Sequence, residues 1–137
     1  MEIKQYSKQY KHDNHLVYSC QYHVIFCSKY RRKILNDNIA NRLKQLVIEK
    51  QTEYFYQLLD MEILLDHVHL LIDVNPKKGV YTIVNMIKGY TSKILREEFP
   101  ELKKRLPTLW TESKFISSVG AVTLETVKKY IEEQKKV

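Results

Sequence analysis

The stretch Leu64-Leu65-Asp66-His67-Val68-His69-Leu70-Leu71-Ile72-Asp73-Val74 predicts a central strand of the fold. It is mostly aliphatic, and it stops at Asn75-Pro76, a pair typical of strand ends. Because side chains alternate along a strand, one face is wholly apolar and should point into the core: Val68, Leu70, Ile72 and Val74. The opposite face carries His67, His69, Leu71 and Asp73.

The two histidines of this stretch stand about 7 Å apart on the second face, given the rise of a strand. Neutral imidazole nitrogens at that spacing can hold one divalent metal ion. A histidine on a strand is more often a half-buried polar residue with a hydrogen-bond partner, so the His67 and His69 pair leaves both interpretations open. The third ligand and the chemistry must come from elsewhere in the chain.

The length of 137 residues suits one domain spanning 1–137, and the 44% of hydrophobic residues are enough for a modest core. There is no run of about 18 apolar residues, and the N-terminus lacks the apolar segment of a signal peptide, so we expect a soluble, cytoplasmic protein. Cys20 and Cys27 lie seven residues apart in one expected strand and would point to opposite faces, which favours two reduced thiols.

The net charge of +7 makes a polyanion, nucleic acid first, the natural partner of this surface. The 10 tyrosines add aromatic faces that can stack on unpaired bases. The basic run Lys29-Tyr30-Arg31-Arg32-Lys33 leaves a strand beside the histidine strand, and we interpret it as a contact to the DNA backbone, a solvated loop being the simpler alternative.

Hydrophobic periodicity predicts an α+β fold with the order β-α-β-β-α-β-α. Two strand-helix-strand halves of this kind form a ferredoxin-like, split βαβ sheet with the helices on one face, which leaves the other face open. Residues 1–13 are expected to be a flexible arm, and Asn36 or Asp37 should cap the first helix. The expected strands are 14–28, 53–65, 64–74 and 110–119, the expected helices are 34–50, 80–98 and 123–136, and 101–107 is a charged connector.

The terminal helix places Tyr130 and Gln134 one turn apart on one face. From the pattern alone, Tyr130 is more often a packing residue and Gln134 a surface residue. A tyrosine hydroxyl has a pKa near 10 and is a poor nucleophile unless a metal or a base assists it. A metal held by the two histidines would provide that assistance.

Several segments, in this order along the chain, resemble the IS200/IS605 family of small transposases, the single-tyrosine, TnpA-like members of the HUH endonuclease superfamily. The match covers about residues 15–135, and its motifs together are far more specific than the histidine pair. They are His23-Val24-Ile25-Phe26, 29–33, Asp66-His67-Val68-His69-Leu70-Leu71-Ile72, Ile87-Lys88-Gly89, 95–100, Trp110 and Val127-Lys128-Lys129-Tyr130-Ile131-Glu132-Glu133-Gln134.

The resemblance implies a metal-dependent DNA transposase that acts on single-stranded DNA. It implies that His67 and His69 are metal ligands, that Gln134 completes the site, and that Tyr130 is the nucleophile. The metal would be Mg²⁺ or Mn²⁺. The substrate would be transposon ends marked by imperfect hairpins, which are cut through a 5′-phosphotyrosine and then rejoined.

The resemblance also implies a homodimer in which the tyrosine helix of one subunit completes the partner's histidine site. The break at Ser118-Val119-Gly120-Ala121 is then the expected hinge, and 123–136 a mobile catalytic helix. The chain departs from the family after Trp110, where Ser113-Lys114-Phe115 stands for the usual Gly-Tyr-Phe, and before it, where 106–109 replaces a two-glycine turn. These departures affect the expected recognition of end sequences.

Two other function classes fit part of the pattern. A non-catalytic single-stranded DNA or RNA hairpin-binding domain explains the basic charge and the tyrosines, but it gives the histidine pair no role. A phosphoesterase needs a third alternating histidine, where position 71 is Leu, or a second His-x-Ser/Thr motif, which none of the other histidines begins. A zinc hydrolase would have to recruit Asp66 or Asp73.

Overall fold

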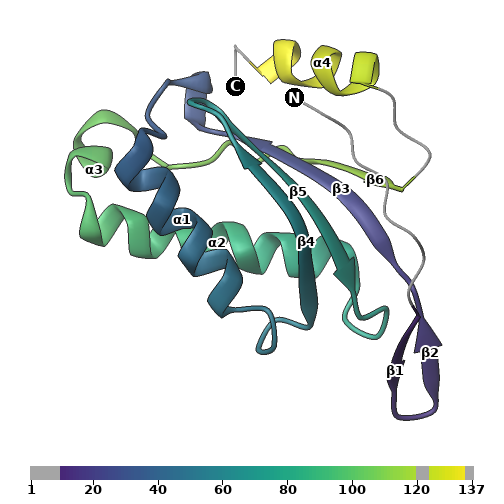
Figure 1. Ribbon diagram of the computed structural model, residues 1–137. Helices are drawn as coiled ribbons and strands as arrows, with labels where there is room; N and C mark the ends of the chain where they lie inside the picture. Colours follow the sequence, from purple (N-terminus) through teal and green to yellow (C-terminus); the bar gives the residue numbers. More distant parts are fainter. Residues whose placement is uncertain (1–9, 120–123, 135–137) are drawn as a thin grey trace.

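The computed structural model describes residues 10–119 and 124–134. Its centre is a four-stranded antiparallel sheet in the order β4-β5-β3-β6 (Figure 1). The first half of the domain is β3 (Gln21–Cys27), α1 (Asp37–Glu49) and β4 (Tyr56–Ile63). The second half is β5 (His67–Val74), α2 (Val80–Glu98) and β6 (Phe115–Ser118). Each half has the other half's first strand inserted between its two strands, which confirms the ferredoxin-like, split βαβ fold.

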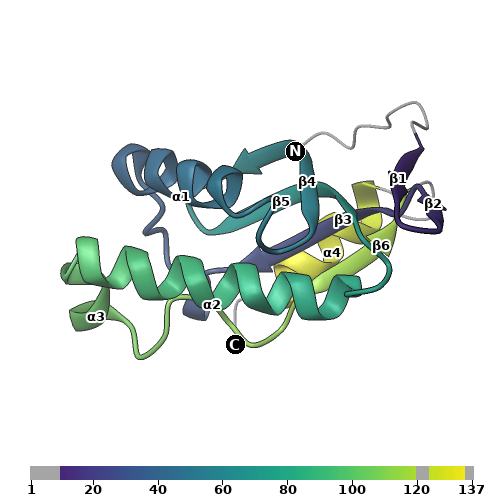
Figure 2. The same ribbon diagram turned by 90° about the horizontal axis from the view of Figure 1, so that it is seen from below.

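The core lies between the sheet and helices α1 and α2, which cover one face together (Figure 2). The alternation in β5 is confirmed, since Val68, Leu70, Ile72 and Val74 are each at most 1% exposed. Helix α1 begins after Asn36, whose side chain accepts a hydrogen bond of 3.0 Å from the backbone of Ile39. Of the two expected caps, Asn36 is therefore the one used.

The expected open face of the sheet is partly covered, which corrects that prediction. Helix α4 (Leu124–Glu133) lies on the side opposite α1 and α2 (Figures 1 and 2). Val127 of this helix is fully buried, and the histidine face of β5 is buried along its whole length. The non-core face of the histidine strand is thus a second, smaller interior.

The N-terminal prediction is wrong in part. Residues 11–18 form a hairpin of β1 (Lys11–Asp13) and β2 (Leu16–Tyr18) around the turn Asn14-His15. The turn is local: Asp13 accepts from the Asn14 backbone, and His15 has a φ of 57°. The expected strand 14–28 is therefore divided between β2 and β3, and residues 1–9 of the expected arm lie outside the described residues.

Two further boundaries differ from the prediction. The expected connector 101–107 contains the short helix α3 (Glu101–Arg105). The expected strand 110–119 pairs as β6 from Phe115 only, while Trp110 forms an isolated bridge to Ser28. The first part of the expected strand does not join the sheet. Its backbone carbonyls at residues 111–113 instead accept hydrogen bonds from the ammonium of Lys88. Among the described residues, no helix is long and apolar enough to cross a membrane.

Candidate functional site

The two histidines of β5 are buried beneath α4, with His67 exposed by 7% and His69 by 5%. The Nδ1 atom of His67 lies 2.7 Å from a carboxylate oxygen of Asp66. This contact makes Nδ1 the protonated nitrogen and leaves the lone pair on Nε2. The Nε2 atom is buried and has no hydrogen-bond partner among the described atoms. A buried imidazole nitrogen without a hydrogen-bond partner is typical of a metal ligand in a structure that holds no metal.

The ring of His69 contacts a third histidine, His23. The Nε2 atom of His69 lies 3.1 Å from Nδ1 of His23, and the rings stack with centroids 5.2 Å apart. Burial, followed by the charge of His23, lowers the pKa of His69 to about 4, and burial lowers the pKa of His23. Both rings are therefore neutral at physiological pH, which is the state that binds metals. The Nε2 atom of His23 is also buried without a partner.

His23 belongs to one of the family-like motifs, but the sequence pattern assigns it no role. The feature that identifies His23 is the pairing of β3 with β5, in which His23 is opposite Leu71 and Ile25 is opposite His69. Residues that pair across antiparallel strands point to the same face. A histidine two residues before the partner of His69 therefore lies diagonally beside it.

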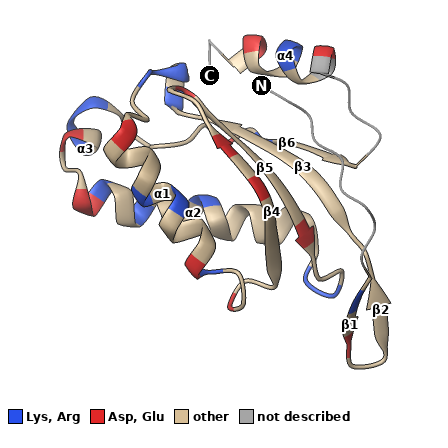
Figure 3. Cartoon of the chain, viewed as in Figure 1, with Lys and Arg blue, Asp and Glu red and all other residues tan. Residues whose placement is uncertain are grey.

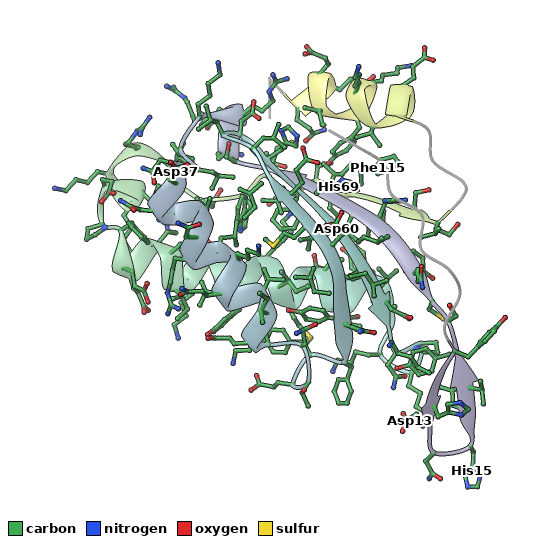
Figure 4. All side chains as sticks on the ribbon, viewed as in Figure 1. Asp13, His15, Asp37, Asp60, His69 and Phe115 are labelled. Carbon is green, nitrogen blue, oxygen red and sulfur yellow. The ribbon has the colours of Figure 1, made fainter. Side chains whose placement is uncertain are left out.

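Acidic side chains stand on the neighbouring strand of the same face. Glu62 of β4 pairs with His69, and Asp60 pairs with Leu71 (Figure 3 shows the acidic segments on β4). Their negative charges raise the pKa of His69, against the larger effect of burial. Figure 4 labels His69, Asp60 and Phe115 together on the sheet below α4. Imidazoles of β3 and β5 and carboxylates of β4 thus share the sheet face beneath the terminal helix.

The terminal helix brings Tyr130 and Gln134 to this face. The ring of Tyr130 packs on Phe115 with centroids 5.3 Å apart, and its hydroxyl lies 3.4 Å from Oγ of Ser113. Phe115 is opposite Ile25 in the sheet, so it shares the histidine face. Burial raises the pKa of Tyr130 to about 12. The phenol is therefore protonated at neutral pH.

Gln134 is buried, contrary to its simplest interpretation as a surface residue. Its side-chain oxygen lies 3.5 Å from Oγ1 of Thr111. The loop that carries Thr111 and Ser113 is fixed from below by Lys88, whose ammonium is 2.6 Å from the Thr111 carbonyl and 3.2 Å from that of Ser113. Burial lowers the pKa of Lys88 to about 8. The buried Lys88 thus fixes the loop that contacts the side chains of Tyr130 and Gln134.

The expected DNA-binding run lies on the short 3₁₀ helix η1 (Lys29–Arg31) and the residues after it. Tyr30 is 46% exposed, with the Lys29 ammonium 5.0 Å from its ring centroid, and Arg32 and Lys33 are exposed. Arg31 instead turns inward to Asp66, with Nε 2.7 Å from the carboxylate. Contact of this run with DNA stays a prediction.

The donor atoms fit a divalent cation. Among the described residues, no three His, Cys, Asp or Glu side chains gather as a metal cluster, so a site here needs a ligand of another type. The imidazoles of His67 and His69 and the buried amide of Gln134 would supply two nitrogens and one oxygen, a set compatible with several divalent ions. The hinge expected at 118–121 and the helix ends at 123 and 135–136 lie partly or wholly outside the described residues.

Comparison with known proteins finds similarity to transposases. Residues 16–134 match the model of the family described as "Transposase IS200 like". The chain is 33% identical to the ISDra2 transposase TnpA of Deinococcus radiodurans over 86% of each chain. It is 30% identical to the transposase for insertion sequence element IS200 of Salmonella typhimurium, over 88% of this chain and 80% of that one.

Two solved structures resemble the fold. A crystal structure from Deinococcus radiodurans R1, described as that of a candidate transposase, has a TM-score of 0.82 and 31% identity over 90% of this chain and 97% of its own. The structure of a REP-associated tyrosine transposase bound to a REP hairpin has a TM-score of 0.57 and 13% identity, over 96% of this chain and 68% of its own.

Proposed function

Because the chain belongs to the family of IS200-like transposases, we propose that it cuts and rejoins single-stranded DNA at hairpin-marked element ends, with Tyr130 as the nucleophile. The observation that carries the proposal is the unpartnered, buried Nε2 of His67 on the sheet face that α4 covers with Tyr130 and Gln134. A hairpin is the proposed substrate because one structural relative is described as bound to one.

The proposed metal site consists of His67, His69 and Gln134, loaded with Mg²⁺ or Mn²⁺. Asp66 supports it by holding the Nδ1–H of His67, so that the Nε2 lone pair is presented to the site. A bound divalent cation would polarise the scissile phosphate and neutralise the charge that develops on it.

The proposed step at Tyr130 is an in-line displacement at phosphorus. The phenolic oxygen forms a bond to phosphorus and releases its proton to water, while the bond from phosphorus to the 3′-oxygen breaks and that oxygen takes up a proton from water. The products are a 5′-phosphotyrosine and a free 3′-hydroxyl. A second 3′-hydroxyl reverses the step on the phosphotyrosine and rejoins the strands. Because the phosphodiester energy is kept in the covalent bond, no nucleotide cofactor is required.

The proposed DNA path follows the exposed part of the basic run. Lys29, Arg32 and Lys33 offer cations to phosphates, and the exposed ring of Tyr30 offers a stacking surface for a base. Neutralising several phosphates makes binding fall steeply with salt concentration. We further propose a homodimer whose active sites are shared between the subunits, as the family resemblance implies; in the single chain described here, α4 lies over the chain's own histidine strand.

A cleavage assay tests the proposal. The substrate is labelled single-stranded DNA with the hairpins that flank the gene, incubated with Mg²⁺ or Mn²⁺ and, in parallel, with EDTA. We expect cleavage that requires metal and is lost in His67→Ala, while the exposed His12→Ala serves as the matched control and stays active. Hairpin binding without cleavage under any metal condition would instead identify a non-catalytic hairpin-binding protein.

A further inference from the structure

The guanidinium of Arg31 joins the terminal helix to the histidine strand. Its Nε donates to Oδ2 of Asp66 over 2.7 Å. Its Nη1 donates to the backbone carbonyl of Ile131 over 3.2 Å and lies 3.5 Å from a carboxylate oxygen of Glu132. Figure 1 shows the C-terminal end of α4 next to η1 and the start of β5. One side chain therefore contacts two elements that lie far apart in the sequence.

The contact to α4 has a clear physical basis. Ile131 lies in the last turn of a helix that ends at Glu133, where carbonyl groups lack their usual donors and the helix dipole is negative. A cation supplied from outside the helix satisfies such a carbonyl and favours the dipole. Arg31 thus acts as a C-terminal cap provided by a distant segment.

The contact between Arg31 and Asp66 extends to His67, the proposed metal ligand. Oδ2 of Asp66 binds Arg31, while Oδ1 of the same carboxylate binds Nδ1 of His67. The carboxylate of Asp66 therefore joins the guanidinium to the imidazole, and a chain of contacts runs from α4 to His67.

The backbone conformation of η1 directs the Arg31 side chain inward. Tyr30 and Arg31 have φ angles of 58° and 53°, a left-handed conformation that is uncommon in residues other than glycine. The turn is closed by hydrogen bonds from the Arg31 backbone to Ser28 and from the Ser28 hydroxyl to the Arg32 carbonyl. As a result the Arg31 side chain is only 17% exposed, whereas Arg32 next to it is exposed.

We propose that Arg31 is a positioning residue that couples docking of α4, and with it Tyr130 and Gln134, to the orientation of His67. The docking part stands on the contacts alone, and the link to metal binding rests on the proposed function. When Arg31 is lost, α4 loses its cap and Asp66 loses one of the two partners that hold it against His67. Seating of the nucleophile helix and alignment of the ligand then fail together.

Hydrogen exchange of the full chain, without DNA or metal, tests the docking part. We expect Arg31→Gln to speed amide exchange in residues 127–134 about tenfold or more, with exchange in β3 and β5 unchanged. Arg32→Gln is the matched control, because it removes the same charge from an exposed neighbour, and it should leave α4 unchanged. Arg31→Lys keeps the charge but not the planar fork, so we expect it to resemble Arg31→Gln.

Three exchange results would overturn the docking part: unchanged exchange in α4, an equal increase in the sheet, or full rescue by Arg31→Lys. Titration calorimetry with Mn²⁺ tests the link to His67, and we expect Arg31→Gln to weaken binding about tenfold while Arg32→Gln does not. Equal Mn²⁺ affinity in the two variants would overturn that link. The two proposals can fail separately. Faster α4 exchange in Arg31→Gln, together with a wild-type protein that never cleaves DNA, rejects only the proposed function.

Discussion

His23 and His69 stack across strands β3 and β5, with Nδ1 of His23 3.1 Å from Nε2 of His69. Both rings are buried, so each must satisfy the other or remain unpaired. Because one of the two nitrogens donates and the other accepts, the tautomers of His23 and His69 are coupled. The third histidine is therefore coupled to the protonation pattern of His69, a proposed metal ligand.

We expect His23→Ala to weaken Mn²⁺ binding about 10- to 100-fold, the usual effect of removing a residue that orients a ligand. Without its stacking partner, the ring of His69 is free to rotate away from His67. Titration calorimetry on the wild-type protein, the variant and the exposed control His12→Ala measures this effect. Unchanged binding in His23→Ala would show that His23 does not orient His69, and tighter binding would mean that His23 competes with the metal for His69.

The bound metal should also raise the stability of the fold. A cation present at about 100 times its dissociation constant stabilises the native state by about 2.7 kcal/mol. For a chain of this size, that corresponds to a rise in Tm of roughly 10 °C. Thermal unfolding with and without Mn²⁺ measures the shift, which should disappear in a His67→Ala, His69→Ala double variant and persist in His12→Ala. A shift that survives the double variant would place the metal elsewhere.

The rate of cleavage should rise with pH. Burial raises the pKa of Tyr130 to about 12, so the phenolate is a minor species at neutral pH and its share grows about tenfold for each pH unit below that value. We expect the single-turnover rate of adduct formation to increase between pH 7 and pH 9 while hairpin binding changes little. A flat rate over this range would show that ionisation of Tyr130 does not limit the step.

The part of the site that sequence predicts is the part that depends on local pattern. Alternation in β5 separates the core face from the histidine face, and Asn36 has the residue type of a helix cap. The neighbours of the histidines depend on strand register and helix docking, which local pattern does not encode. For this reason the sequence assigns no role to His23. It also does not separate Arg31 from its exposed basic neighbours, although a left-handed backbone turns Arg31 inward.

The loop below α4 shows a second limit of sequence reasoning. Lys88 lies within a helix whose bounds match their prediction, and a lysine in an amphipathic helix is usually exposed. Here its ammonium is buried beneath the carbonyls of Thr111 and Ser113, which shortens the expected strand to β6. A polar residue that organises a distant loop gives no periodic signal, so only the tertiary structure identifies it.

We expect Lys88→Met to destabilise the fold by about 2–3 kcal/mol, since it retains the aliphatic stem but removes the donor to the buried Thr111 carbonyl. Lys93→Met, at an exposed position of the same helix, is the matched control and should change stability by less than about 0.5 kcal/mol. Urea unfolding of both variants measures the difference. Equal stability of the two variants would show that the carbonyls of the loop do not depend on Lys88.

Covalent capture tests the central claim most directly. The protein is mixed with end-labelled single-stranded DNA carrying the flanking hairpins and Mn²⁺, and the products are separated under denaturing conditions. We predict a protein–DNA adduct that requires metal, maps to Tyr130 and is absent from both Tyr130→Phe and His67→Ala, while Tyr130→Phe still binds the hairpin. An adduct that persists in Tyr130→Phe would contradict the assignment of the nucleophile, and cleavage without any adduct would contradict the phosphotyrosine mechanism.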